Sequence, residues 1–217
     1  MKLSLVLNQL RHGGLRQVTE DDKTDAVVVN HINMAILKLY GRFPLEMKEA
    51  IITLRDDKVL YTLASTDTDV LVDGAPVVDE TVGPILNVFN EAGEVDINNE
   101  YNDFSVFTPT YNTIQIPTAT TGNYISVLYR ANPEWIVFTD GDDSSLIDIK
   151  LPMVLLEPLL YYTSYLVHSS QISGLDTEGH SYYMKYEASC KRLENEGLLS
   201  TDSSEINTNA NEKGGFL

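Results

Sequence analysis

Apolar residues recur at helical spacing near the start of the chain. The first stripe consists of Leu3, Val6, Leu7 and Leu10, and Gly13-Gly14 follows it. The second stripe consists of Val28, Ile32, Ala35, Ile36, Leu39 and Phe43. This spacing predicts two amphipathic helices. Thr19, followed by Asp22, is the expected N-cap of the second helix, and Pro44 ends it because proline disfavours helical geometry in the preceding residue.

The middle of the chain alternates between short β-prone runs and turn residues. The runs span residues 46–54, 59–64, 85–89, 104–107, 113–116, 124–129 and 135–138. The breaks between them contain Asp56-Asp57, Asp73-Gly74, Ala92-Gly93, Thr121-Gly122-Asn123 and Asp140-Gly141. Runs of this length separated by such turns are typical of a small antiparallel sandwich or barrel. Prolines in this stretch are expected at strand ends or edges, where a missing N–H donor is tolerated.

Helical periodicity returns after Leu151 and predicts two more helices. The apolar side of the third consists of Leu156, Leu159, Leu160, Thr163, Leu166 and Val167. Pro158 leaves two possibilities: the helix begins near it, or the first turn is kinked there at a cost of about 3 kcal/mol. The fourth helix, from about residue 179 to 196, carries Tyr182, Tyr183, Tyr186, Cys190 and Leu193 in steps of three and four. Gly197 is its expected end.

The resulting fold class is α+β, with a four-helix bundle interrupted by an antiparallel β insert. The bundle is assigned to residues 1–45 and 151–198, and the β-rich insert to 46–150. Residues 199–217 are predicted to form an extended, flexible C-terminal arm because the stretch is almost entirely polar. Its apolar residues near the end, Phe216 and Leu217, suggest a docking hook, although a frayed terminus has the same composition.

Charge is concentrated in the β-prone part. The 217 residues contain 32 Asp and Glu against 15 Lys and Arg, for a net charge of −17. Residues 59–149 hold fifteen of the carboxylates and one basic residue, Arg130. Clustered cations are needed to hold phosphate, so this composition argues against nonspecific binding to nucleic acid or to membranes. Solubility alone is the simplest use of such charge, and tolerance of a neighbouring polyanion is the more specific one.

Cysteine and hydropathy patterns bear on the cellular setting. Cys190 is the only cysteine, which excludes an internal disulfide and fits assembly in a reducing cytoplasm. Its place on the apolar stripe of the fourth helix predicts a buried, unreactive thiol. No stretch approaches the roughly 20 apolar residues that a membrane span requires.

Candidate chemistry is sparse. Asp140, Asp142 and Asp143 form the densest carboxylate group, but an EF-hand begun at Asp140 would place Leu151 where the bidentate Glu belongs, so a solvated turn is favoured. Asp67, Asp69 and Asp73 receive the same interpretation. The four histidines, at positions 12, 31, 168 and 180, show no metal-binding spacing. With no phosphate-cradling loop, serine elbow or dinucleotide fingerprint, the chain is predicted to be no enzyme and to need no cofactor or metal.

Tyrosines are repeated on both C-terminal helices. They lie at positions 161, 162, 165, 182, 183 and 186. Few cations accompany them, so helix-to-helix packing is favoured over stacking on nucleic acid. Their hydroxyl groups are expected at a polar rim or a neighbouring subunit.

Four segments together resemble the head-to-tail adaptor proteins of tailed bacteriophages, the group that includes the tail tubular protein A of short-tailed phages. They are residues 35–45 (AILKLYGRFPL), 105–109 (SVFTP) with 113–117 (TIQIP), 161–170 (YYTSYLVHSS) and 182–190 (YYMKYEASC). The likeness spans about residues 20–198. The resemblance rests on the order and spacing of the four segments, because each of them is a packing motif and not a catalytic signature.

The resemblance implies a structural virion protein that forms a ring, of twelve subunits, between portal and tail and lines the DNA channel. It implies a virion location after assembly in the host cytoplasm, with portal and tail proteins as partners. On this view the C-terminal arm, through Ile206, Phe216 and Leu217, would engage the portal. The loop of Asp140, Asp142 and Asp143 would face the channel or the tail.

Two further expectations complete the sequence-based interpretation. Arg130, Tyr162 and Tyr183 are the candidate subunit-interface residues. The alternative function is an acidic β-domain that binds a metal ion or a glycan through the 140–143 turn.

Overall fold

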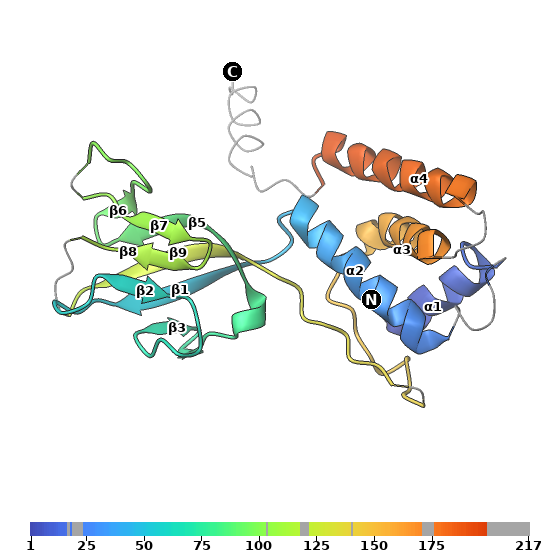
Figure 1. The fold of residues 1–217 in the computed structure, drawn as a ribbon, viewed down its shortest axis with the longest axis horizontal. Coiled ribbons are helices and arrows are strands. Elements are labelled where there is room, and N and C mark those ends of the chain that lie inside the picture. Colours follow the sequence, from blue (N-terminus) through green and yellow to red (C-terminus); the bar gives the residue numbers. More distant parts are fainter. Residues whose placement is uncertain are drawn as a thin grey trace, which may run out of the picture. The chain divides into compact units, whose positions relative to one another are not determined.

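The chain consists of two compact units. Figure 1 shows the computed structural model, which describes residues 1–16, 18, 24–102, 104–117, 122–139, 141–170 and 176–198. The helical unit contains residues 1–45 and the described residues from Trp135 onward, and the β unit is Glu46–Glu134. Each unit encloses its own cluster of buried apolar side chains.

The helical unit is centred on one helix. Its helices are α1 (Leu3–His12), α2 (Asp25–Arg42), α3 (Leu156–Ser170) and α4 (Asp176–Asn195), with the short 3₁₀ turn η3 (Met153–Leu155) before α3. α1, α2 and α4 each contact α3. The predicted apolar stripes of α1 and α2 are buried, and both helices end where glycine and proline predict.

Two helix starts differ from expectation in detail. The N-cap of α2 is Thr24 and not Thr19, which lies outside the described residues together with Asp22. α3 begins two residues before Pro158, so the proline occupies the first turn. The N–H groups of a first turn lack intrahelical partners, and proline is therefore tolerated there.

An extended segment completes the core of the helical unit. Ile149 and Leu151 are buried in this core, and Ile136 and Ile147 pack against it. The N-terminus pairs with the segment in both directions: Met1 N donates to Ile149 O at 2.7 Å, and Ile149 N donates to Met1 O at 2.7 Å. Residues 135–150, expected in the β insert, therefore lie in the helical unit, and the predicted strand 135–138 is not a strand.

The described residues of the β unit form nine strands in two antiparallel sheets. They are β1 (Met47–Thr53), β2 (Leu60–Thr62), β3 (Val70–Val72), β4 (Ala75–Pro76), β5 (Val82–Asn90), β6 (Gly93–Val95), β7 (Phe107–Thr110), β8 (Thr113–Gln115) and β9 (Tyr124–Ala131), with the 3₁₀ turn η2 (Asp79–Thr81) before β5. The larger sheet has the order β4-β3-β1-β9-β5-β6, and the smaller has β2-β8-β7. Both contribute to one core, with Ile52, Val88 and Val127 from the larger and Tyr61 and Ile114 from the smaller.

Turn and proline chemistry explain several features of the sheets. Asp73 and Gly74 both have positive φ, 51° and 77°, which is the two-residue turn that matches strand twist in a hairpin, here between β3 and β4. Pro76 and Pro109 lie on the edge strands β4 and β7, and Pro84 lies where the register of β5 against β9 shifts. These are places where a strand does not need that N–H.

The predicted four-helix bundle with an antiparallel insert is wrong. The strands form a larger body than an insert, with two sheets and a separate core, and the helices need the extended segment 135–151 to complete theirs. The predicted run 104–107 is also wrong for most of its length, since β7 begins at Phe107. Periodicity indicates which side of a helix is buried but not which other element covers it. The prediction of a four-helix bundle assumed that the helices cover only one another.

Candidate interaction surfaces

One side of α2 remains outside the core and forms a groove with α3 and α4. Its floor and walls, here called the α2 groove, consist of Met34, Leu37, Lys38, Gly41, Arg42, Tyr162 and Glu187, which enclose about 600 Å³. Met34 is 49% exposed and Leu37 is 39% exposed. Residues 26–45 contain no carboxylate, although the chain has 32. The α2 side of this groove is therefore apolar and cationic in an otherwise acidic protein.

Arg42 fixes the groove by joining α2 to α4. Its Nη1 donates to Glu187 Oε2 at 2.8 Å and its Nε donates to Glu194 Oε1 at 2.7 Å. The guanidinium group also lies over the Tyr186 ring, 5.7 Å from its centroid. The hydrogen bond from Arg42 lowers the pKa of Glu194. Because two carboxylates neutralise Arg42, its role is structural.

Lys38 is the groove's available cation. Its side chain is exposed, and among the described residues no carboxylate forms an ion pair with it. An unpaired ammonium beside exposed Met34 and Leu37 gives a surface that suits an apolar, anionic partner.

The tyrosines pack between α3 and α4, as their helical spacing predicts. Tyr162 lies 4.7 Å from Tyr186 between ring centroids, and Tyr165 lies 5.2 Å from Tyr183. Tyr162 and Tyr183, the candidate interface residues, are half-buried by these contacts. Only Tyr162 also lines the α2 groove. Burial raises the pKa of the Cys190 thiol to about 11, which agrees with its predicted packing role.

The β unit has an apolar pocket of its own, here called the β pocket. It encloses about 250 Å³ over the buried side chains of Leu54, Val106, Ile116 and Ile125. Phe104, 80% exposed, and Tyr124, 55% exposed, stand at its rim. Glu91 is the rim's carboxylate and has no ion-pair partner among the described residues. Aromatic rings left in water beside an apolar pocket mark a contact surface.

The loop that carries Phe104 is held by its own polar side chains. Asp96 accepts hydrogen bonds from Asn102 Nδ2 at 2.8 Å and Asn99 Nδ2 at 3.0 Å, and these bonds lower its pKa. Ser105 Oγ donates to Asp96 O at 2.9 Å, and Phe104 N donates to Asn102 Oδ1 at 3.0 Å. The backbone N–H of Phe104 and the described residues near it are thus held by hydrogen bonds, which reduces the entropy lost when a partner binds.

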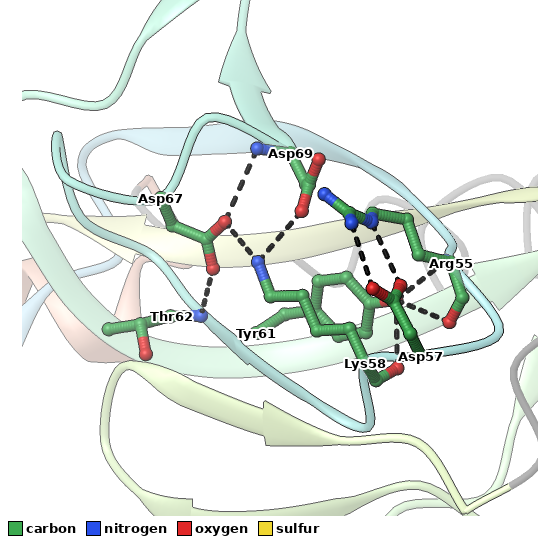
Figure 2. Close-up of polar contacts among 7 residues, drawn as sticks. All are labelled: Arg55, Asp57, Lys58, Tyr61, Thr62, Asp67 and Asp69. Atoms are coloured by element: carbon green, nitrogen blue, oxygen red, sulfur yellow. Dashed lines mark hydrogen bonds and ion pairs between the residues drawn. The ribbon is translucent and has the colours of Figure 1, made fainter.

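A cluster of charged side chains lies in the loops before and after β2 (Figure 2). Lys58 Nζ donates to Asp67 Oδ1 at 2.5 Å and to Asp69 Oδ2 at 2.8 Å, and it lies 4.7 Å from the centroid of the Tyr61 ring. Asp67 also accepts the backbone N–H groups of Thr62 and Asp69. Beside this cluster, Arg55 donates two bonds to Asp57. The ammonium group offsets one of the two negative charges and bonds to both carboxylates, so this Lys58 clamp holds the loop before β2 to the loop after it.

The clamp corrects one interpretation of the acidic turns. Asp67 and Asp69 were expected to be solvated, but their side chains are only 10% and 18% exposed. Asp73 is exposed, as expected. Lys58 was missed because it precedes these carboxylates by nine and eleven residues, a separation with no local pattern. A lone lysine before two alternate aspartates in an acidic stretch was the available signal.

Asp142 and Asp143, of the predicted acidic turn, accept hydrogen bonds from neighbouring residues. Asp142 Oδ2 accepts from Thr139 N at 2.7 Å and from Thr139 Oγ1 at 2.8 Å, and Asp143 Oδ1 accepts from Ser145 N at 2.9 Å. The bonds from Thr139 lower the pKa of Asp142, and hydrogen bonds from the side chain and the backbone of Ser145 lower the pKa of Asp143. Asp140 lies outside the described residues. Across the part of the chain that the structure describes, no three metal-ligating side chains are grouped.

The remaining predicted residues are Arg130, expected at a subunit interface, and three residues of the C-terminal arm. Arg130 is half-buried on the central strand β9, opposite Met47 of β1. Ile206, Phe216 and Leu217 lie outside the described residues.

Comparison with known proteins identified no relative. A scan of protein-family models found none that matches the chain, and a search of curated proteins also found no match. Within the described ranges, no helix is both long and apolar enough to cross a membrane. Function is therefore inferred from the surfaces of the two units and from the resemblance of the sequence segments.

Proposed function

We propose that the protein is a head-to-tail adaptor of a tailed bacteriophage, a structural protein that forms a ring between portal and tail around the DNA channel. The observation that carries the proposal is the placement of charge in the β unit. Residues 46–134 contain fifteen carboxylates and four cations, and none of the described carboxylates there is buried. The unit therefore presents an anionic surface to solvent.

Such a surface suits a wall past which DNA moves. Each cation that contacts a phosphate releases counterions and adds affinity, so a basic wall would retain DNA. An acidic wall repels it, and the repulsion is strongest at low salt. The cations of the β unit are also engaged: Lys58 lies between two aspartates and Arg55 is paired with Asp57.

The remaining parts of the proposal concern partners. Arg130, Tyr162 and Tyr183 are proposed to lie at or near contacts between subunits, and Ile206, Phe216 and Leu217 to engage the portal. The segment resemblance supplies the number of subunits, twelve, and the location in the virion. The protein acts by assembly, with no catalytic step and no cofactor.

Reconstitution tests the proposal. The full chain is mixed with purified portal rings from the phage that encodes it, and the mass of the product is measured. We expect a defined ring of adaptor copies on each portal, and a chain that leaves the portal mass unchanged would overturn the assignment. A cryo-EM reconstruction of that complex tests the charge argument, which fails if every carboxylate of residues 46–134 lies on the outer wall.

Removal of residues 200–217 separates docking from folding. The described core of both units lies before this segment, so we expect unchanged thermal unfolding and complete loss of portal binding. Unchanged portal binding by the shortened chain would exclude the C-terminal segment as the docking element.

A further inference from the structure

We propose that the α2 groove of one copy of the chain binds the β pocket of a second copy. Met34 and Leu37 supply the apolar side chains, and Lys38 pairs with Glu91 at the pocket rim. This inference rests on the proposed function in one respect, since it assigns the contact that would join neighbouring subunits of the ring.

The β pocket is large enough to receive an apolar side chain, and the α2 groove exposes two such side chains. The β pocket offers about 250 Å³ over buried core side chains, and its rim includes the exposed ring of Phe104. An apolar cavity of about 150 Å³ already holds a benzene molecule, so the pocket is large enough for one methionine or leucine side chain. Met34 and Leu37 are large, apolar and exposed on a helix, which holds them in fixed directions.

The charges select a second copy as the occupant. Lys38 is the cation that the α2 groove offers, because Arg42 is already paired with Glu187 and Glu194, whereas the β unit has a net charge of −11. Lys38 and Glu91 are both exposed, and neither has an ion-pair partner among the described residues. Opposite charges at the edges of two apolar patches steer their encounter and fix their register.

Contacts between like surfaces are disfavoured by the same charges. Two β pockets facing each other would bring two strongly acidic units together, and two α2 grooves would oppose their Lys38 ammonium groups. The pairing of unlike surfaces leaves each bound pair with one free pocket on one copy and one free groove on the other. Such heterologous contacts propagate into rings or filaments, which is the geometry that an adaptor ring requires.

Self-association of the full chain tests the proposal. Sedimentation is measured over a dilution series up to the highest soluble concentration, in low and high salt. We expect concentration-dependent association that Leu37→Ser or Phe104→Ser weakens by about tenfold or more, as loss of a central apolar anchor does. Leu5→Ser and Tyr111→Ser are the controls, because Leu5 is 37% exposed on α1 and Tyr111 is 63% exposed in the β unit.

Mixing the two variants distinguishes a contact between unlike surfaces from a contact between two identical surfaces. A Leu37→Ser copy keeps its pocket and a Phe104→Ser copy keeps its groove, so the mixture should stop at heterodimers. Lys38→Glu and Glu91→Lys should each weaken association, and the double variant K38E/E91K should restore it.

Several results would overturn the inference: a wild-type chain that stays monomeric over the series, association that survives Phe104→Ser, or a mixture that forms no heterodimer. The adaptor assignment would stand in each case if the chain still formed rings on the portal. Failure to bind the portal, with the heterodimer intact, would instead remove the adaptor assignment and leave this contact in place.

Discussion

At the scale of single residues, the Lys58 clamp shows how an acidic chain neutralises its own repulsion. Burial lowers the pKa of Lys58, but hydrogen bonds to Asp67 and Asp69 outweigh this effect and the net shift is upward. Burial raises the pKa of Asp67, and its bonds from Lys58, Thr62 N and Asp69 N overcome that, so the net shift is downward. The ion pair therefore stabilises the fold while Asp67 is ionised.

Replacing Asp67 tests this coupling. Asp67→Asn should lower the free energy of unfolding at neutral pH by about 1–3 kcal/mol, because a half-buried ammonium loses a charged partner. An aspartate with a lowered folded pKa contributes stability above its unfolded value of about 3.9 and loses it as pH falls further. The difference between wild type and variant should thus shrink below about pH 4, as urea unfolding at several pH values would measure.

The control for this experiment is Asp73→Asn. Asp73 is exposed and has positive φ, a conformation that asparagine also adopts, so little change is expected. A difference between wild type and Asp67→Asn that stayed constant to low pH would show that packing, and not charge, explains the loss.

Two glycines of the helical unit should respond oppositely to alanine. A Cβ at Gly14 would lie 1.9 Å from the Oγ atom of buried Ser164, so Gly14→Ala should cost about 1–3 kcal/mol of stability through overpacking. A Cβ at Gly41, inside α2, meets nothing within 4 Å, and Gly41→Ala should stabilise by about 0.5–1 kcal/mol. Thermal unfolding of the two variants measures whether each is less or more stable than the wild type. The same change in stability in both variants would contradict the packing explanation.

At the scale of elements, residues 135–139 show why an extended segment need not be a strand. The side chain of Asn33 takes the place of a neighbouring strand: its Nδ2 donates to Ile136 O at 2.9 Å, and its Oδ1 accepts from Ile136 N at 2.9 Å. One buried amide on α2 thereby satisfies both backbone groups of the residue that it faces.

Removing that amide should release the segment. Asn33→Ala leaves the partly buried N–H and C=O of Ile136 without these bonds, which should cost about 1–3 kcal/mol in total. Hydrogen exchange at the Ile136 amide should accelerate, whereas exposed Asn30 on the same helix can be changed to alanine with little effect. An Ile136 amide that exchanged at the wild-type rate would show that the bond is dispensable.

Sequence patterns predicted elements better than their partners. The α1 and α2 stripes, the Gly13 and Gly197 helix ends and the Asp73-Gly74 turn follow from local rules, and they are confirmed. β3 and β6, of three residues each, are too short for a periodic signal, and the 135–138 run is β-prone without a strand partner. Of the predicted interface residues, Tyr162 lines the α2 groove. Lys58, Glu91 and Phe104 were not predicted from the sequence, because their partners and the pocket that they line come from distant parts of the chain.

At the scale of the whole molecule, the chain enters and leaves the β unit on adjacent strands. Met47 at the start of β1 is paired with Arg130 near the end of β9, and Ala131 N donates to Glu46 O at 3.0 Å. Strands and core of this unit are complete within residues 46–134. A body with its own core and neighbouring ends has the properties of an independently folding domain.

Expression of residues 46–134 alone tests that independence. We expect a cooperative thermal transition and the circular dichroism of antiparallel sheet, because the fragment keeps its core and its strand pairing. The helical unit, with a short Gly-Ser linker in place of 46–134, should also fold. A β fragment that melted without cooperativity would show that its stability depends on the rest of the chain.

The pairing of Met1 with Ile149 sets an order of events during synthesis. The β unit is complete once residue 134 has been made, whereas α1 and α2 must wait for the segment at 147–151 and for α3. The end of α2 at Arg42 and Leu151 are 109 residues apart, which the ribosome covers in roughly 5–20 s at about 5–20 residues per second. During this interval the apolar stripes of both helices emerge without the surface that covers them, so the part of the protein that is translated first is the part that reaches its native state last.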